Sequence, residues 1–508
     1  MAEGLFSFAN VAMADFLSVM NSIKTTDFYQ GPDVARDEWM MQINRYMQAF
    51  RYYSGLVFDT TLGETKMAAY PLRVNIVRAM CNAQAAAVWG QWDGQLVELK
   101  ADPKDNTDGA KEKSNQAVQI VQETWEASNL DQKLIEGSIA MQVYGGTYFR
   151  AYVDMQAPHG VRVDKLMPYS VFPRYHPIQT NRILEAYIVM PLDRTEASLA
   201  YGIPKDQLPE FPLYQEHWTE TEYETTVNGI LIKNGNGLNP WGIVPVVYIP
   251  RLRLEAFFGL PLPEDLYGLQ DELNTRLADV GDKIADNAHP IRWVKNYRGN
   301  VKKDLIIDSD VIWDLGFSPP GQEGPEVGVL KSEPEPASTF EFMNFLVEMT
   351  RFASSTSPVA FGIDEGSQRS GVTLEVRLWP MLMQARVSRV YLKWGMVAIN
   401  NLILKMVQAS GIVIDPVVFS HLVKPVMAPL VPRDVQQVIE EISQRAAHDL
   451  ISPEETVAMT GVRAGTSEDE VGRIRQWLTD RSASKRPEPG PGTPSGPTGD
   501  TSRPPQRK

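Results

Sequence analysis

The sequence PEDLYGLQDELNTRLADVGDKIADNAHP, residues 263–290, is amphipathic. Apolar residues recur in it every three or four positions, which predicts an α-helix from Pro263 to Asn287. These residues are Leu266, Leu269, Leu273, Leu277, Val280 and Ile284. The opposite face is acidic and carries Asp271, Glu272, Asp279, Asp282 and Asp286. The helix should end at His289-Pro290, since the residue before a proline disfavours the α conformation.

A small basic insert and a second helix follow this first helix. Residues 291–336 are predicted to form short strands and turns. Their cations include Arg292, Lys295, Arg298, Lys302 and Lys303. The next helix is predicted over residues 338–354, with Ser338 as its N-cap and Glu341 as the capping-box partner.

The segment from Ser354 to Gly371 is small and polar, which predicts a mobile loop. Residues 372–410 then form the longest helical pattern of the chain, and Pro380 inside it predicts a kink. An apolar series at helical spacing in this pattern is expected to face the core. The series comprises Trp379, Met383, Val387, Val390 and Trp394.

Upstream of residue 263, the pattern predicts a β region set among helices. Residues 145–250 are rich in aromatic and β-branched side chains, and Asn228-Gly229 predicts a tight hairpin turn. Helices are predicted before this region, at 33–53, 71–89, 116–125 and 130–144. Together with the downstream helices, this order indicates a multidomain α+β protein.

The composition narrows the classes of partner. The chain of 508 residues has a formal net charge of −14, which is the wrong sign for gripping nucleic acid through its phosphates. A DNA partner would therefore be guided rather than held. Its one cysteine, Cys81, allows neither an intrachain disulfide nor a cysteine zinc cage, and favours a reducing compartment. No run of about 18 apolar residues occurs, so no membrane span is predicted.

Sequence motifs for catalysis are missing. The chain has no phosphate-binding P-loop and no Gly-x-Ser-x-Gly elbow, and its six histidines are scattered. We therefore expect no cofactor, no metal site and no enzymatic activity. An enzyme whose active site is built from distant residues remains the alternative.

Several local motifs follow one another along the chain. They are Asn239-Pro-Trp-Gly-Ile-Val-Pro-Val-Val247, residues 264–274, Ala288-His-Pro290, residues 370–377, Pro432-x-Asp434 and residues 450–456. These motifs and the order of the predicted elements resemble the portal proteins of tailed bacteriophages of the siphophage type, over roughly residues 40–465. Val372-Thr373 and Glu375, at the entry to the long helix, depart from the residues usual in that family.

The resemblance implies a portal fold whose long helices line the channel of a ring. By analogy the chain divides into an N-terminal arm (1–30), a wing (31–262, with a long kinked helix and return at 372–430), two stem helices (263–290 and 338–354), a clip (291–337), a tunnel loop (355–371), a crown (431–480) and a disordered tail (481–508).

The family also implies a function and partners. It forms a ring of twelve subunits, sometimes thirteen, at one capsid vertex of the virion, after assembly in the host cytoplasm. Double-stranded DNA enters through the channel during packaging and leaves through it during ejection. The expected partners are the terminase large subunit, then the head-completion adaptor, and the major capsid and scaffolding proteins. The alternative is another ring-forming virion connector or adaptor protein.

Three groups of residues follow as candidate sites. Gln368 and Arg369 of the tunnel loop are expected to approach DNA phosphates, although an ordinary exposed loop is the alternative. The stem carboxylates Asp271, Glu272, Asp279, Asp282 and Asp286 would form a channel wall that repels phosphate, or simply a solvated helix face. The clip cations Arg298, Lys302 and Lys303 would face the motor or the adaptor, with a plain solvated surface as the alternative.

Overall fold

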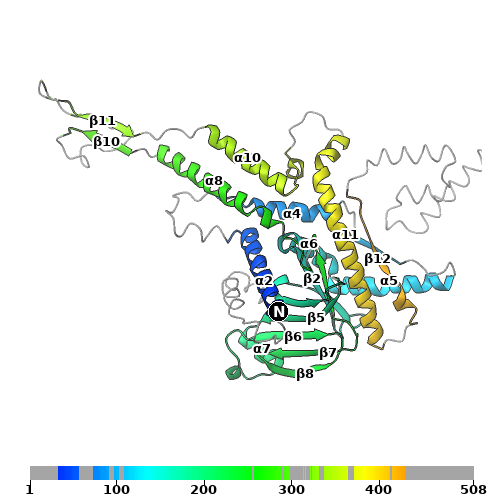
Figure 1. The fold of residues 1–508 in the computed structure, drawn as a ribbon. Helices are drawn as coiled ribbons and strands as arrows, with labels where there is room; N and C mark the ends of the chain where they lie inside the picture. Colours follow the sequence, from blue (N-terminus) through cyan, green and yellow to red (C-terminus); the bar gives the residue numbers. More distant parts are fainter. Residues whose placement is uncertain are drawn as a thin grey trace, which may run out of the picture. The chain divides into compact units, whose positions relative to one another are not determined.

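A computed structural model describes most of residues 33–430 as a mixture of helix and strand (Figure 1). The chain divides into two compact units, residues 1–431 and 432–508, and the described residues all belong to the first. The predicted arm, crown helices and tail therefore lie outside the described residues. The internal gaps in the description are 57–72, 91–95, 102–107, 180, 255–256, 289–290, 298–312, 314, 316–317, 319–320, 322, 331–336, 364–370 and 412–414.

Among the described residues, four helices precede the β region, as predicted. They are α2 (Asp33–Ser54), α4 (Ile76–Trp89), α5 (Asp108–Ser128) and α6 (Leu130–Tyr144). Helix α4 begins at Ile76 rather than at residue 71, because Asn75 caps it: its side-chain oxygen accepts a hydrogen bond from the Arg78 amide at 2.9 Å. Helix α5 begins eight residues before the predicted Gln116. The prediction missed these first turns because they are polar and carry no apolar pattern.

The β region forms two antiparallel sheets. Its strands are β2 (Gly146–Val153), β3 (Val161–Leu166), β4 (Val171–Tyr175), β5 (Ile183–Pro191), β6 (Leu213–Thr219), β7 (Glu222–Val227), β8 (Ile230–Leu238) and β9 (Val246–Pro250). The three-stranded sheet has the order β3-β2-β9, and the five-stranded sheet has the order β4-β5-β6-β7-β8. Helix α7 (Arg194–Tyr201) connects β5 towards β6. The predicted turn is confirmed, since Asn228 and Gly229 have φ angles of 51° and 78° and join β7 to β8.

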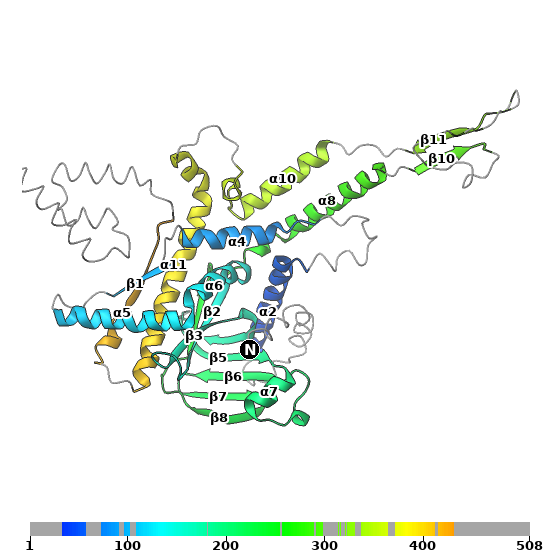
Figure 2. The ribbon, with the colours of Figure 1, turned by 180° about the vertical axis from the view of Figure 1, so that it is seen from behind.

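The long helix α11 (Gly371–Ala409) completes the N-terminal core. Its buried Leu392 and Ile403 belong to the same apolar cluster as Trp125 of α5, Leu134 of α6 and Phe149 of β2. Sequence-distant segments are therefore parts of one hydrophobic core (Figures 1 and 2).

A two-stranded sheet joins two segments of this core that lie far apart in the sequence. Strand β1 (Val97–Ala101) pairs antiparallel with β12 (Val423–Met427), so that Val97 lies opposite Met427. Close by, the buried Asn400 of α11 accepts a hydrogen bond from the Trp125 indole at 2.9 Å and donates one to the Val423 carbonyl at 3.1 Å.

The amphipathic stretch folds as predicted and forms one arm of a helical hairpin. Helix α8 (Tyr267–Ala288) ends just before His289, and α10 (Ala337–Ala353) lies along it (Figures 1 and 2). Between them the chain forms the antiparallel strands β10 (Ile291–Lys295) and β11 (Glu326–Leu330). The predicted N-cap is wrong, because α10 already begins at Ala337 and Ser338 lies inside the helix.

The segment between α10 and α11 contains a local turn near its start. Residues 358–361 form a 3-10 turn, and the Ser357 hydroxyl accepts a hydrogen bond from the Val359 amide. Gly371 already belongs to α11, where Pro380 lies within the helix. None of the helices in the described part of the chain is long and apolar enough to span a membrane.

Candidate functional site

The structure describes only part of the predicted sites. The tunnel-loop pair Gln368 and Arg369 lies outside the described residues, and so do the clip cations Arg298, Lys302 and Lys303. The stem carboxylates all belong to α8, although the side chain of Asp286 is outside the description.

Several carboxylates on the acidic face of α8 have a partner within the same subunit. The Tyr52 hydroxyl donates a hydrogen bond to Asp271 at 2.6 Å. Burial, and then this hydrogen bond, raise the pKa of the Tyr52 phenol. Arg276 forms ion pairs with Glu272 at 2.7 Å and with Asp279 at 3.3 Å. Three of the predicted channel-wall carboxylates thus have a partner within their own subunit.

A groove of about 570 Å³ lies between α8 and α10. Its lining mixes cations, carboxylates and hydroxyls with one aromatic ring. The lining residues are Arg276, Asp279, Asp282, Lys283, Ser338, Thr339 and Phe342. Among the described residues, Oδ1 of Asp282 is buried and has no hydrogen-bond partner. Opposite charges therefore meet in the groove, and it does not favour a ligand of one sign.

The base of the hairpin is held by one buried amide, Gln270, which is 1% exposed. Its Oε1 accepts hydrogen bonds from the amides of Ile76 at 2.8 Å and Val77 at 3.2 Å. Its Nε2 donates to the Val74 carbonyl at 2.7 Å. The first amides of a helix have no partner inside the helix, so α8 supplies the missing acceptor for α4. Sequence reasoning missed Gln270, because its place beside the apolar stripe of α8 does not show which backbone groups it contacts.

Helix α4 also holds the far end of α10. Its buried Gln84 donates hydrogen bonds to the Ser354 carbonyl at 2.8 Å and to the Thr356 hydroxyl at 3.2 Å. These residues begin the segment that leads from α10 towards α11. No sequence pattern pointed to this contact, because an isolated Gln in an Ala-rich helix is equally compatible with a solvated position.

The C-terminus of α4 is bound by α11. Arg389 donates from Nε to the Val88 carbonyl at 2.8 Å and from Nη2 to the Trp89 carbonyl at 2.9 Å. A cation at this end also complements the helix dipole. Helix α4 therefore makes polar contacts with α8, with the end of α10 and with α11.

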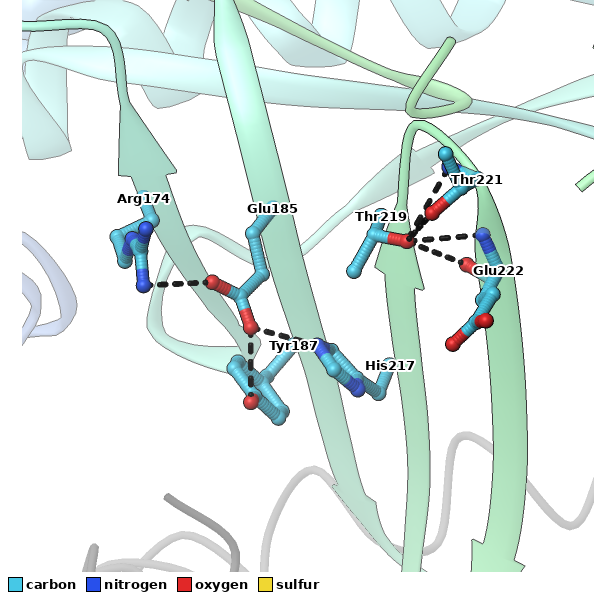
Figure 3. Close-up of polar contacts among 7 residues, drawn as sticks. All are labelled: Arg174, Glu185, Tyr187, His217, Thr219, Thr221 and Glu222. Atoms are coloured by element: carbon cyan, nitrogen blue, oxygen red, sulfur yellow. Dashed lines mark hydrogen bonds and ion pairs between the residues drawn. The ribbon is translucent and has the colours of Figure 1, made fainter. Parts of the chain in front are cut away.

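The five-stranded sheet carries a separate polar cluster (Figure 3). His217 Nε2 lies 2.7 Å from Oε1 of Glu185, the Tyr187 hydroxyl donates to the same oxygen at 3.0 Å, and Arg174 lies 3.2 Å from Oε2. The hydrogen bond with His217, ahead of those from Tyr187 and the charge of Arg174, lowers the pKa of Glu185. The cluster thus stabilises an ionised carboxylate between β4, β5 and β6.

The nearby hydroxyl in Figure 3 does not complete a nucleophile–base pair. Thr219 Oγ1 donates to the Glu222 carbonyl at 3.0 Å and accepts from the Glu222 amide at 2.9 Å, within the β6–β7 turn. Its bonding is therefore local to the turn. Within the described ranges, no three His, Cys, Asp or Glu side chains gather in a way that could hold a metal ion.

A second carboxylate, Glu216, is buried on the other face of β6. It forms an ion pair with Arg150 of β2 at 2.5 Å and accepts hydrogen bonds from the Trp218 indole at 2.8 Å and from the Tyr214 hydroxyl. Since β2 and β6 belong to different sheets, this group joins the two sheets. Its donors satisfy a charge that would otherwise be unfavourable in the interior.

The apolar series of α11 is not in the core, so that expectation is wrong. Its residues are between 39% and 65% exposed. The core face of α11 instead carries the buried Ala385, Leu392 and Met396. Both faces of this helix are apolar, and periodicity alone does not say which one points inward.

A comparison with known protein families matches most of the chain. The family model described as "Phage portal protein, SPP1 Gp6-like" matches residues 34–481. A comparison with curated proteins found no match. The family is in general one of structural connectors without enzymatic activity. With the match extending over most of its length, the chain belongs to the SPP1 Gp6-like family of phage portal proteins, capsid-associated oligomers of the virion vertex.

Proposed function

We propose that this portal protein forms a closed ring of twelve subunits and that DNA passes through its central channel during packaging and ejection. The observation that carries the proposal is the order α8, β-hairpin, α10, connecting segment and α11 in a chain of the portal family. Helix pairs of this kind, repeated around an axis, can line a channel, and rings arise from head-to-tail contacts that close.

The domain roles follow this order. Residues 31–262 with 372–430 would form the wing, which is supported by the core that α11 shares with α5 and α6. The α8–α10 pair would be the stem, residues 291–337 the clip, and residues 355–371 the tunnel loop. The division of the chain after residue 431 supports a separate crown at 431–480.

In this arrangement the acidic face of α8 would line the channel. Each copy has a formal net charge of −14, so the ring repels phosphate and lets DNA slide. Arg276 offsets only one of the two charges of Glu272 and Asp279, so the face keeps a net negative charge, to which Asp271, Asp282 and Asp286 would contribute. At physiological salt this repulsion extends only about 8–10 Å.

The remaining site residues have assigned roles in the same proposal. Gln368 and Arg369 would contact DNA phosphates from the tunnel loop. Arg298, Lys302 and Lys303 would bind the terminase large subunit and later the head-completion adaptor. The major capsid and scaffolding proteins would surround the assembled ring at its vertex.

Mass photometry and negative-stain microscopy of the purified protein test the ring. Twelve chains of 56.9 kDa should give particles of about 680 kDa with a central hole. A compact monomer or dimer at all concentrations would overturn the proposal. If rings form, Arg369→Ala should lower the rate of DNA packaging, whereas Lys205→Ala, an exposed lysine of the β region, should not.

A further inference from the structure

Helix α11 presents an apolar surface that no described residue covers. We name it the α11 stripe. Its members lie on one side of the helix, opposite the core face, and are between 39% and 65% exposed. They are Val376, Trp379, Met383, Val387, Val390 and Trp394. A contiguous exposed series of this size marks an interaction surface rather than ordinary solvated helix.

Cations follow one edge of the α11 stripe. Arg386 and Lys393 are both exposed and stand seven residues apart, and the Arg386 guanidinium lies 4.9 Å from the centre of the Trp379 ring. The sequence has no carboxylate between Val376 and Gly411. The surface is therefore both apolar and positively charged.

Helix α10 presents a second surface of the opposite charge. Its buried Leu346 and Thr350 face the subunit, whereas Phe345 and Phe352 are 53% and 82% exposed. Glu341 and Glu348 alternate with these rings on the same side. We name the series Glu341, Phe345, Glu348 and Phe352 the α10 stripe. Its spacing of four, three and four residues follows one face of a helix.

We infer that the α10 stripe of one subunit packs against the α11 stripe of the next subunit in the ring. The inference rests on the proposed ring and names the helices that hold it together. Apolar residues recur at seven-residue spacing in both stripes, and the carboxylates of the α10 stripe have the same spacing as the cations beside the α11 stripe. Such a match specifies how the two helices pair, because opposite charges attract in the correct register and like charges repel in other registers.

A second copy of this chain is the occupant that fits both surfaces. A closed ring requires two different surfaces on every subunit, each complementary to the other. The two stripes meet that requirement within one sequence. Glu348 already forms an ion pair with Arg351 of its own helix, so Glu341 should be the more responsive of the two carboxylates.

Charge reversal tests the pairing. The variant Arg386→Glu/Lys393→Glu and the variant Glu341→Lys/Glu348→Lys should each lower the ring fraction roughly tenfold or more, because like charges then face each other. The fourfold variant should recover rings, since attraction is restored with reversed signs. The control Lys100→Glu/Lys205→Glu makes the same change in net charge as Arg386→Glu/Lys393→Glu, at exposed sites outside both stripes, and should leave rings intact.

The outcomes separate the two proposals. If the unmodified protein forms no rings, the proposed function is wrong. If it forms rings and both reversed variants form them equally well, the ring stands and the α10–α11 pairing is wrong. Failure of the fourfold variant to regain rings, with circular dichroism like that of the unmodified protein, would also count against the pairing.

A photo-cross-link identifies the occupant directly, even where a reversed variant folds poorly. Burial raises the pKa of the Cys81 thiol to about 12, so it stays unreactive and Val390→Cys can be labelled alone with a maleimide–diazirine. In rings mixed from light and heavy isotope chains, the adduct should join Val390→Cys to peptide 337–353 of another chain. An adduct within residues 432–508, or within the same chain, would overturn the inference.

Discussion

Replacing Gln270 by alanine should loosen the start of α4 specifically. The substitution removes the acceptor of the Ile76 and Val77 amides and the donor to the Val74 carbonyl. Val74 is 44% exposed, so water can replace its lost donor, whereas Val77 is fully buried. Each buried donor left without a partner costs about 1–3 kcal/mol, and the half-buried Ile76 amide should be at the lower end, so the two amides together predict a loss of about 2–4 kcal/mol.

The substitution Gln270→Glu should also destabilise the protein. Its carboxyl group can still accept from both amides, but the position is 1% exposed, so an ionised carboxylate loses its hydration there and cannot donate to the Val74 carbonyl. The favourable position near the positive end of the helix contributes only about 0.3–1 kcal/mol and offsets part of this cost. Both variants should therefore be less stable than the unmodified protein.

Hydrogen exchange measured on the assembled protein is the appropriate assay. The amides of Ile76 and Val77 should exchange at least about tenfold faster in the Ala variant, since 1.4 kcal/mol corresponds to a factor of ten. Gln132→Ala, an exposed amide on α6 that contacts Glu136, should change stability by no more than about 0.5 kcal/mol. Slow exchange at both amides in the Ala variant, with unchanged stability, would refute the capping role of Gln270.

Three further predictions concern polar groups within the first unit of the chain, residues 1–431. Arg150→Met should destabilise the protein by about 3–5 kcal/mol in thermal unfolding, because it leaves Glu216 buried and unpaired. Adding Glu216→Leu should recover most of this loss. Equal stability of the single and double variants would contradict the prediction. Because the folded-state pKa of Glu185 is lowered, its ionised form contributes stability above about pH 4.5 that is lost as the pH falls through the folded pKa. Glu185→Gln should therefore be most destabilising at neutral pH. A difference in melting temperature between this variant and the unmodified protein that stays constant from pH 7 to pH 3 would contradict the prediction. Arg389→Met should lower stability by roughly 1–2 kcal/mol in denaturant unfolding, since two carbonyls at the end of α4 lose a charged donor.

Local periodicity predicted the elements whose two faces differ. Helix α8 follows from its apolar series and its acidic opposite face, and β7 and β8 follow from the turn at Asn228-Gly229. Periodicity failed for α11, because both of its faces are apolar and only tertiary packing selects Leu392 rather than Val390 for the interior.

The candidate site was predictable in part for the same reason. The acidic face of α8 is a property of one helix, and the offset by Arg276 is visible in its spacing from Glu272 and Asp279. The cap that Gln270 provides for α4 joins residues about 190 positions apart, so no local pattern could have revealed it.

The pairing of β1 with β12 determines when the core can form during synthesis of the chain. Val97 leaves the ribosome roughly 330 residues before Val423, so at about 5–20 residues per second β1 waits on the order of 15–65 s for its partner. For most of that time α11 has not yet been made, so the apolar side chains of α5 and α6 that later pack against it stay exposed. Exposed apolar side chains make an unfinished chain prone to aggregate. The core closes only when almost all of the first unit has been made, which excludes unfinished chains from any assembly that requires it.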